Sequence, residues 1–309
     1  MSENNILYGS NRELGILFIA PFDVRKSVYA TALLAKIMLV YPRSEVTLSG
    51  GFLSSSLYSC FANRLKIRGG NKPFSLRYFA PLLKNKWDIV VNLEPSKSGM
   101  LKFLRKEQYI DLSGIDYTSD KINPVEFMGK TVSISNLSPE IPLSDEFVRG
   151  AEKRLYKKQH VIAVAPFTDA GEPIIPIADM SALIKRLTMA GGLFPASPVA
   201  FLGFEKVRKK AQKELLRDIP DWQRINLIGS LGLLSITAVL NKCRFYIGGN
   251  SVVSHLAAVN NIASWVAKGN DNDYVKVWGR YAYEFDVSDT SVDKIVSEID
   301  DVWHGKLQQ

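Results

Sequence analysis

Cysteine and long apolar runs are scarce in this 309-residue sequence. Its two cysteines, Cys60 and Cys243, lie in opposite halves without CxxC spacing, which argues against a disulfide framework and a zinc site. No stretch approaches the roughly 20 apolar residues of a membrane span. The segment Met1 to Arg12 lacks the charged and apolar regions of an export signal. We therefore expect a cytoplasmic protein.

Positive charge is concentrated in one segment of the chain. The net charge is +8, and the segment from Arg64 to Lys106 alone holds eleven Lys and Arg against two acids, a net charge of +9. Aromatic residues are interleaved there, among them Phe74, Tyr78, Phe79 and Trp87. The pattern fits contact with an anionic partner such as acidic lipid headgroups, a phosphorylated glycan or nucleic acid. It fits equally well a solvated helix face above buried aromatic rings.

The length of the chain favours two domains, because a single core usually stops growing below this size. Apolar runs of strand length alternate with helical spacing almost throughout, the pattern of parallel sheets covered by helices on both faces. Thr131 to Asp145 has two prolines and no helical period, which indicates a connection. We expect an α/β fold with Rossmann-like domains over 1–140 and 141–290. A C-terminal helix within 291–309 could pack back on the first domain.

The apolar runs and the helical spacing also predict individual elements. Strands are expected at Ile16 to Ala20, Val46 to Leu48, Ile89 to Leu93, Tyr109 to Leu112, Val161 to Ala165, Val199 to Gly203, Ile225 to Ile228, Phe245 to Gly248 and Ser264 to Ala267. Helices are expected at Ser27 to Tyr41, Phe74 to Lys86, Glu146 to Lys158, Ile177 to Ala190, Glu205 to Arg217, Leu233 to Cys243, Val252 to Asn260 and Val292 to Lys306.

The most informative segment is RFYIGGNSVVSHLAAVNN, residues 244–261. It predicts a strand, a tight turn through Gly248 and Gly249, and a helix capped by Asn250 or Ser251. The free N–H groups of such a helix end suit a diphosphate at the carboxyl edge of a doubly wound sheet. His255, one turn into the helix, could approach phosphate oxygens or could be a satisfied, partly buried histidine.

The run from Ile228 to Asp273 resembles the ADP-heptose lipopolysaccharide heptosyltransferase family, through GNSVVSHLAAVNNIASWVAKGNDND with Gly269, Asn270 and Asp271 in a glycine loop. WDIVVNLE, VIAVAPFTDAG, VAFLGFEKV and NLIGSLGLLSITAVLNKC resemble further family segments in the same order. The resemblance implies a GT-B fold, two Rossmann-like domains facing a cleft, and a metal-independent glycosyltransferase with no cofactor beyond its nucleotide-sugar substrate. It implies a donor site at Thr168, Asp169, Gly203, Gly249, Asn250, Ser251, Val252 and His255.

The first loop departs from the family pattern. Family members place a catalytic aspartate just before the first helix, and here simple register puts Lys26 at that position. Asp23, three residues earlier, is the best available base, since a base must reach the attacking hydroxyl. Arg25 and Lys26 are candidate contacts for phosphate or acceptor.

The second half departs from the family pattern too. APFTDAGEPIIP lacks the family's phosphate-binding lysine and has Glu172 and Pro173 nearby. Asn250 replaces an aspartate, Val252 a glycine and Leu234 a ribose-binding glutamate. A β-branched side chain at 252 would limit how closely phosphate approaches the backbone.

These residues leave three functions open. The first is an inverting glycosyltransferase acting on a lipopolysaccharide-core or similar acceptor, with Arg64 to Lys106 near an anionic glycolipid or the inner membrane face. The second is a protein of the same fold that has lost transfer and binds a glycan or nucleotide. The third, nucleic-acid binding through the +9 segment, is the least favoured.

Overall fold

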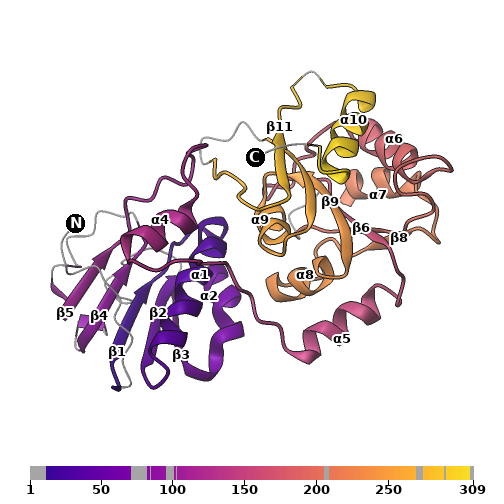
Figure 1. The fold of residues 1–309 in the computed structure, drawn as a ribbon. Coiled ribbons are helices and arrows are strands. Elements are labelled where there is room, and N and C mark those ends of the chain that lie inside the picture. The colour runs from indigo at the N-terminus through magenta and orange to yellow at the C-terminus, as the bar shows by residue number, and fades with distance from the viewer. Residues whose placement is uncertain are drawn as a thin grey trace. The chain divides into compact units, whose positions relative to one another are not determined.

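The computed structural model describes residues 12–70, 82–83, 85–94, 101, 103–204, 209–268, 274–288 and 290–306. The chain divides into two compact units, Met1–Pro142 and Leu143–Gln309. Figure 1 traces the elements of each unit along the chain. Of the helices in the described ranges, none is long and apolar enough to cross a membrane.

The first unit contains a five-stranded parallel sheet in the order β3-β2-β1-β4-β5. Its strands are β1 (Gly15–Ile19), β2 (Glu45–Gly51), β3 (Leu65–Gly70), β4 (Lys86–Asn92) and β5 (Arg105–Asp111). Its helical elements are α1 (Val24–Val40), α2 (Phe52–Tyr58), the 3-10 helix η2 (Ser59–Arg64) and α4 (Pro124–Thr131).

Several features of the first unit differ from the sequence-based expectation: α2, η2 and α4 were not predicted, and two further differences have a local physical reason. Helix α1 begins at Val24, earlier than expected, because the carboxylate of Asp23 caps it by accepting from the N–H of Arg25. Strand β3 was not expected. It lies at the sheet edge, where buried Leu65 alternates with exposed Lys66 and Arg68, so its apolar signal is short.

The basic segment is described only in part. Phe74, Tyr78 and Phe79 lie outside the described residues, as does most of the helix expected at Phe74 to Lys86, whose last residue is the first of β4. Trp87 is a core residue: it is 4% exposed and its indole N–H donates to the carbonyl of Leu82. For Trp87 the buried-aromatic interpretation is therefore confirmed.

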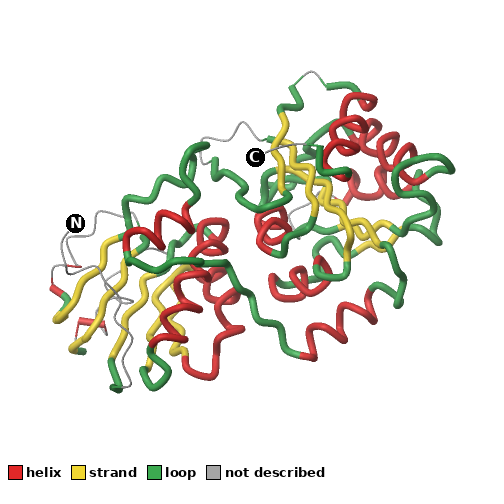
Figure 2. Tube along the Cα trace, viewed as in Figure 1, coloured by secondary structure: helices red, strands yellow, loops and turns green. Residues whose placement is uncertain are grey.

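The second unit contains a six-stranded parallel sheet in the order β11-β10-β9-β6-β7-β8. Its strands are β6 (Val161–Ala165), β7 (Val199–Phe201), β8 (Arg224–Asn226), β9 (Cys243–Gly249), β10 (Ala263–Ala267) and β11 (Ala282–Phe285). Its helices are α5 (Asp145–Arg154), α6 (Ile177–Thr188), α7 (Lys209–Arg217), α8 (Leu233–Leu240), α9 (Val252–Val259) and α10 (Val292–Trp303). Figure 2 shows strands and helices alternating along this unit.

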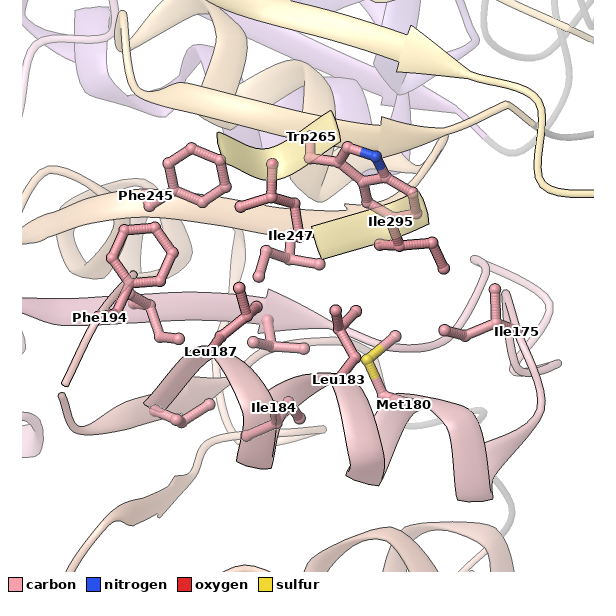
Figure 3. Close-up of a cluster of buried hydrophobic side chains, with 14 of the residues drawn as sticks. Ile175, Met180, Leu183, Ile184, Leu187, Phe194, Phe245, Ile247, Trp265 and Ile295 are labelled. Carbon is pink, nitrogen blue, oxygen red and sulfur yellow. The ribbon is translucent and has the colours of Figure 1, made fainter. Parts of the chain in front are cut away.

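The helices cover both faces of the second sheet. Helix α6 buries Met180, Leu183, Ile184 and Leu187, which recur at helical spacing, against a cluster that includes Phe245 of β9 (Figure 3). Helices α8 and α9 contact each other and β9, and α5 packs on α8. Strand residues of a fully covered parallel sheet are almost continuously apolar, as in the VIAVA of β6.

The C-terminal helix packs within the second unit. The apolar face of α10 lies in the core of that unit through Ile295, Ile299 and Val302. The buried indole of Trp265 on β10 donates to the Glu298 carboxylate of this helix at 2.9 Å. Helix α8 is also shorter than expected, since Cys243 already starts β9.

Candidate functional site

The turn from β9 into α9 depends on two close approaches. A Cβ at Gly248 would lie 2.1 Å from the hydroxyl oxygen of Tyr246, which precedes it by two residues on the same face of the strand. A Cβ at Gly249 would lie 2.4 Å from Cγ2 of Ile174. The two glycines therefore let a buried ring and a neighbouring loop close over the end of β9.

The amino end of α9 is already bound to a carboxylate of this chain. The N–H of Val252, the first residue of the helix, donates to Asp169 at 3.1 Å to Oδ2 and 3.3 Å to Oδ1. Next to it, the N–H of buried Ser251 donates to Ser254 Oγ at 3.0 Å. The anion expected at this helix end on physical grounds is thus supplied internally.

A tight turn after β6 positions Asp169. The N–H of Thr168 donates to the carbonyl of Glu172 at 2.8 Å, and the N–H of Gly171 donates to the carbonyl of Thr168 at 2.9 Å. Phe167 and Pro173 close the turn with an isolated bridge. Asp169 sits at the tip of this turn and is partly exposed.

Asn250 belongs to a second polar cluster at the same end of the sheet. Its amide donates to the carbonyl of Val275 at 2.8 Å and to Glu284 Oε1 at 2.7 Å, and Tyr274 donates its hydroxyl to Glu284 Oε2. His255 Nε2 lies 3.4 Å from Asn250 Oδ1, and His255 is fully buried. Burial raises the pKa of Glu284 above its usual range, although the hydrogen bonds from Tyr274 and Asn250 oppose the shift.

The structure brings most of the predicted donor residues together. Thr168, Asp169, Gly249, Asn250, Ser251, Val252 and His255 all lie at or next to the carboxyl ends of β6 and β9. Gly203, which follows β7, accepts from the N–H of Gly229 at 2.9 Å and has a φ of +155°, a conformation that glycine tolerates. The predicted loop of Gly269, Asn270 and Asp271 lies outside the described residues. The roles of all these predicted donor residues in nucleotide-sugar binding stay predictions.

The corresponding edge of the first sheet carries Asp23, the predicted base. Arg25 holds both of its oxygens: Nε and the backbone N–H donate to Oδ1, and Nη2 donates to Oδ2 at 2.8 Å. Burial alone would raise the pKa of Asp23, but the hydrogen bonds and charge of Arg25 outweigh it, so the pKa lies below its usual value. Such a carboxylate stays ionised at neutral pH and is a weak base.

Three further groups lie around the loop between β1 and α1 that carries Asp23. Glu94, just past the end of β4, accepts from the N–H of Phe22 at 2.7 Å. The Lys26 ammonium lies 5.5 Å from the ring centroid of Tyr117, whose hydroxyl is buried. Burial, together with the charges of Glu94 and Asp23, raises the pKa of Tyr117. Lys26 therefore contributes positive charge close to the Asp23 carboxylate, whose pKa it helps to lower.

Sequence reasoning missed four polar residues of these sites: Glu94, Tyr117, Tyr274 and Glu284. A signal existed for Glu94, which directly follows an apolar strand at the edge where parallel sheets bind ligands. None existed for Glu284, because the short AYEF of β11 was not recognised as a strand. Tyr117 and Tyr274 lie in irregular segments, where no periodicity marks burial.

One depression of about 570 Å³ lies elsewhere in the second unit, at the amino ends of β9 and β10. Arg244 and Trp303 are among its lining residues. The Arg244 guanidinium stacks 5.4 Å from the Trp303 ring centroid and donates to Ser197 Oγ at 2.9 Å. This depression is at the opposite strand ends from Asp169 and Val252, so it is separate from the predicted donor site.

Comparison with known proteins agrees with the sequence resemblance. Residues 130–261 match the model of glycosyltransferase family 9 (heptosyltransferase). This match runs from the last two residues of α4 to just past the end of α9 and so includes the helix end bound by Asp169. A search of curated protein sequences gives no match.

Solved structures give matches over nearly the whole chain. The Escherichia coli ADP-heptose lipopolysaccharide heptosyltransferase II aligns with a TM-score of 0.69 and 15% identity, covering 95% of this chain and 99% of that one. A family 9 glycosyl transferase from Veillonella parvula aligns with a TM-score of 0.67 and 15% identity, covering 94% of this chain and 92% of that one. The E. coli heptosyltransferase WaaC with ADP aligns with a TM-score of 0.66 and 12% identity, covering 94% of this chain and 100% of that one.

These matches confirm the α/β fold of two Rossmann-like domains, of the GT-B type. The resemblance to the heptosyltransferase family is likewise confirmed, through the family model together with the shared fold. The combination supports a glycosyltransferase.

Proposed function

We propose that this chain, which has the fold of the family 9 glycosyltransferases, is an inverting and metal-independent glycosyltransferase. It transfers a sugar, with heptose the first candidate, from a nucleotide diphosphate-sugar to a lipopolysaccharide-core or similar glycan. The single observation that carries the proposal is the family match over residues 130–261, which takes in β6, β9 and α9 with the loops at their carboxyl ends.

The proposed reaction assigns the residues as follows. An acceptor hydroxyl attacks the anomeric carbon, the bond to the diphosphate oxygen breaks, and Asp23 takes the hydroxyl proton. The negative charge that develops on the leaving diphosphate is stabilised by the amide end of α9 and by the cationic side chains of Arg25 and Lys26. Buried His255 acts on this site through Asn250. The basic segment from Arg64 to Lys106 favours an anionic acceptor at the cytoplasmic membrane face.

A second candidate is a protein that binds a nucleotide or glycan without transferring it. Two observations favour it: Arg25 holds both oxygens of Asp23, and Asp169 holds the N–H of Val252. The first weakens the base and the second covers the expected phosphate position.

The two candidates are separated by binding and transfer measurements on the full chain. ADP, UDP, GDP and their sugars, including ADP-heptose, are added at millimolar concentration, and a ligand that binds the native state must raise the melting temperature. Transfer to a lipopolysaccharide-core acceptor is followed by mass spectrometry. The transferase proposal predicts both a shift and a glycosylated product. A shift without product favours the binding protein, and no shift with any nucleotide contradicts both the transferase and a nucleotide-binding protein, which leaves only a glycan-binding protein.

Asp23→Asn tests the base. Asparagine caps a helix about as well as aspartate, so α1 should be retained. We expect transfer to fall at least about 100-fold with unchanged nucleotide binding, the usual scale for losing a general base. The matched control is Glu126→Gln on α4, an exposed acid paired with Lys130 in the same unit. Equal transfer by Asp23→Asn and the wild type would remove Asp23 as the base.

A further inference from the structure

We propose that Asp169 is an internal competitor for the donor's diphosphate and that its charge sets how tightly this chain binds a nucleotide. The inference rests on the proposed function, because it concerns the same helix end. It adds a residue that controls access of the anionic ligand to that end.

The contact itself is that of an anion bound at a helix terminus. Both carboxylate oxygens of Asp169 lie within 3.3 Å of the Val252 nitrogen, although the two residues are 83 positions apart in the sequence. A phosphate oxygen bound to this N–H would need the same position. The carboxylate and a diphosphate therefore cannot occupy the helix end together.

The loop that carries Asp169 strengthens this competition. From Val161 to Pro176 the sequence has two acids, Asp169 and Glu172, and no Lys or Arg. The negative charge of Asp169 and one phosphate charge about 4 Å away repel each other, which weakens phosphate binding about fivefold even in bulk water and by more at a protein surface. A diphosphate carries at least two charges, so the total penalty exceeds about tenfold.

The surroundings allow the carboxylate to be displaced. Asp169 is partly exposed and Ala170 beside it is exposed, whereas Phe167 at the base of the turn is buried. The backbone hydrogen bonds of Thr168 and Gly171 hold the turn together without involving the Asp169 side chain. Rotation of the Asp169 side chain away from Val252 would leave these backbone hydrogen bonds of the turn in place.

The substitution Asp169→Asn separates charge from structure. An asparagine oxygen can still accept from the Val252 N–H, so the helix cap is preserved while the negative charge is lost. Glu172→Gln is the matched control: it removes one charge from the same turn, and its carboxylate is not the one that binds Val252. The comparison distinguishes the contact from a change in net charge.

The test measures the dissociation constants of inorganic pyrophosphate and ADP by titration calorimetry, at constant ionic strength, for the wild type and both variants. We expect Asp169→Asn to bind both probes at least about tenfold more tightly, which corresponds to about 1.4 kcal/mol. We expect Glu172→Gln to change binding less than about threefold.

The outcomes separate the two proposals. Equal affinity of the wild type and Asp169→Asn overturns the inference while leaving the transferase proposal intact. Weaker binding by Asp169→Asn also overturns it and would make Asp169 a ligand contact. Binding only by Asp169→Asn supports the inference and contradicts transfer by the wild type. If no variant binds either probe, the inference is wrong, and the transfer assay alone then decides the proposed function.

Discussion

Gly248→Ala should destabilise the second unit strongly, because the space for a side chain at this position is already filled. The new Cβ would lie 2.1 Å from the Tyr246 hydroxyl oxygen, 2.5 Å from its Cζ and 3.0 Å from its Cε1. Tyr246 is fully buried, so its ring has no solvent to move into. Gly248 also pairs with Val266 of β10 and Ala165 of β6, which restrains the strand from both sides.

The expected cost follows from the number of atoms that must move. Overpacking a core usually costs about 1–3 kcal/mol. Here the hydroxyl oxygen and two ring carbons of Tyr246 crowd the new methyl group and neither the ring nor the strand can yield, so we expect about 3 kcal/mol. For a unit of this size that is a fall of roughly 6–12 °C in Tm.

Urea unfolding followed by tryptophan fluorescence is a suitable assay. Four of the five tryptophans, all except Trp87, lie in the second unit, so the signal mainly reports that unit. Gly150→Ala on α5 is the control, because its Cβ would meet only the terminal Nη1 of the flexible Arg154 side chain. It should stabilise the unit by up to about 1 kcal/mol, the helix-propensity difference between glycine and alanine.

A double-mutant cycle identifies the clashing residue. Tyr246→Leu removes the hydroxyl, Cζ and Cε1 together, so Gly248→Ala should cost less than about 1 kcal/mol in that background. The coupling energy should then be about 2 kcal/mol, which is within the range for residues in contact. An equal cost of Gly248→Ala in both backgrounds would refute the steric argument.

Three further predictions concern titratable groups. Arg25→Gln should lower stability at pH 7 but hardly at pH 2. The lowered pKa of Asp23 contributes stability that is present above the pKa of this group in the unfolded chain and is lost as pH falls through its pKa in the folded protein. Equal loss of stability at both pH values in thermal melts would contradict this. The stability of the wild type should decline as pH rises from about 4.3, the pKa of Glu284 in the unfolded chain, through the raised pKa of Glu284 in the folded protein. Glu284→Gln should remove this decline, and parallel curves of stability against pH for the two proteins would contradict the prediction. Burial raises the pKa of Cys60 and Cys243 to about 12 each, so Ellman's reagent should react slowly with the native chain at neutral pH and quickly in urea; fast native reaction would show an accessible thiolate.

Local chemistry made the main elements of the fold predictable. The run VIAVA could only satisfy its backbone and bury five apolar residues as an interior strand, and β6 has the predicted bounds. Helix α9 begins at Val252 as expected, because the glycines and Ser251 stop the strand and start the helix within a few residues. These signals lie within one segment, so the sequence contains them in full.

Short or edge elements carried too little signal. In β3, charged residues alternate with Leu65 and Ile67 over only six positions, and β11 has four residues. Strands that pair on one side need few apolar side chains, so nothing in their composition separates them from loops.

The sequence by itself determined that an amide-rich helix end would follow β9, and it also supplied the residues around that end. What occupies the end was decided by tertiary structure: Asp169 reaches Val252 across 83 positions, and Asn250 reaches Glu284 across 34. Such pairings depend on strand order and on the geometry of two separate loops, and both are set by packing of the whole sheet. A local sequence pattern specifies neither the strand order nor the geometry of the two loops. An anion at the amino end of α9 could therefore be expected from the sequence, but not that Asp169 would supply it.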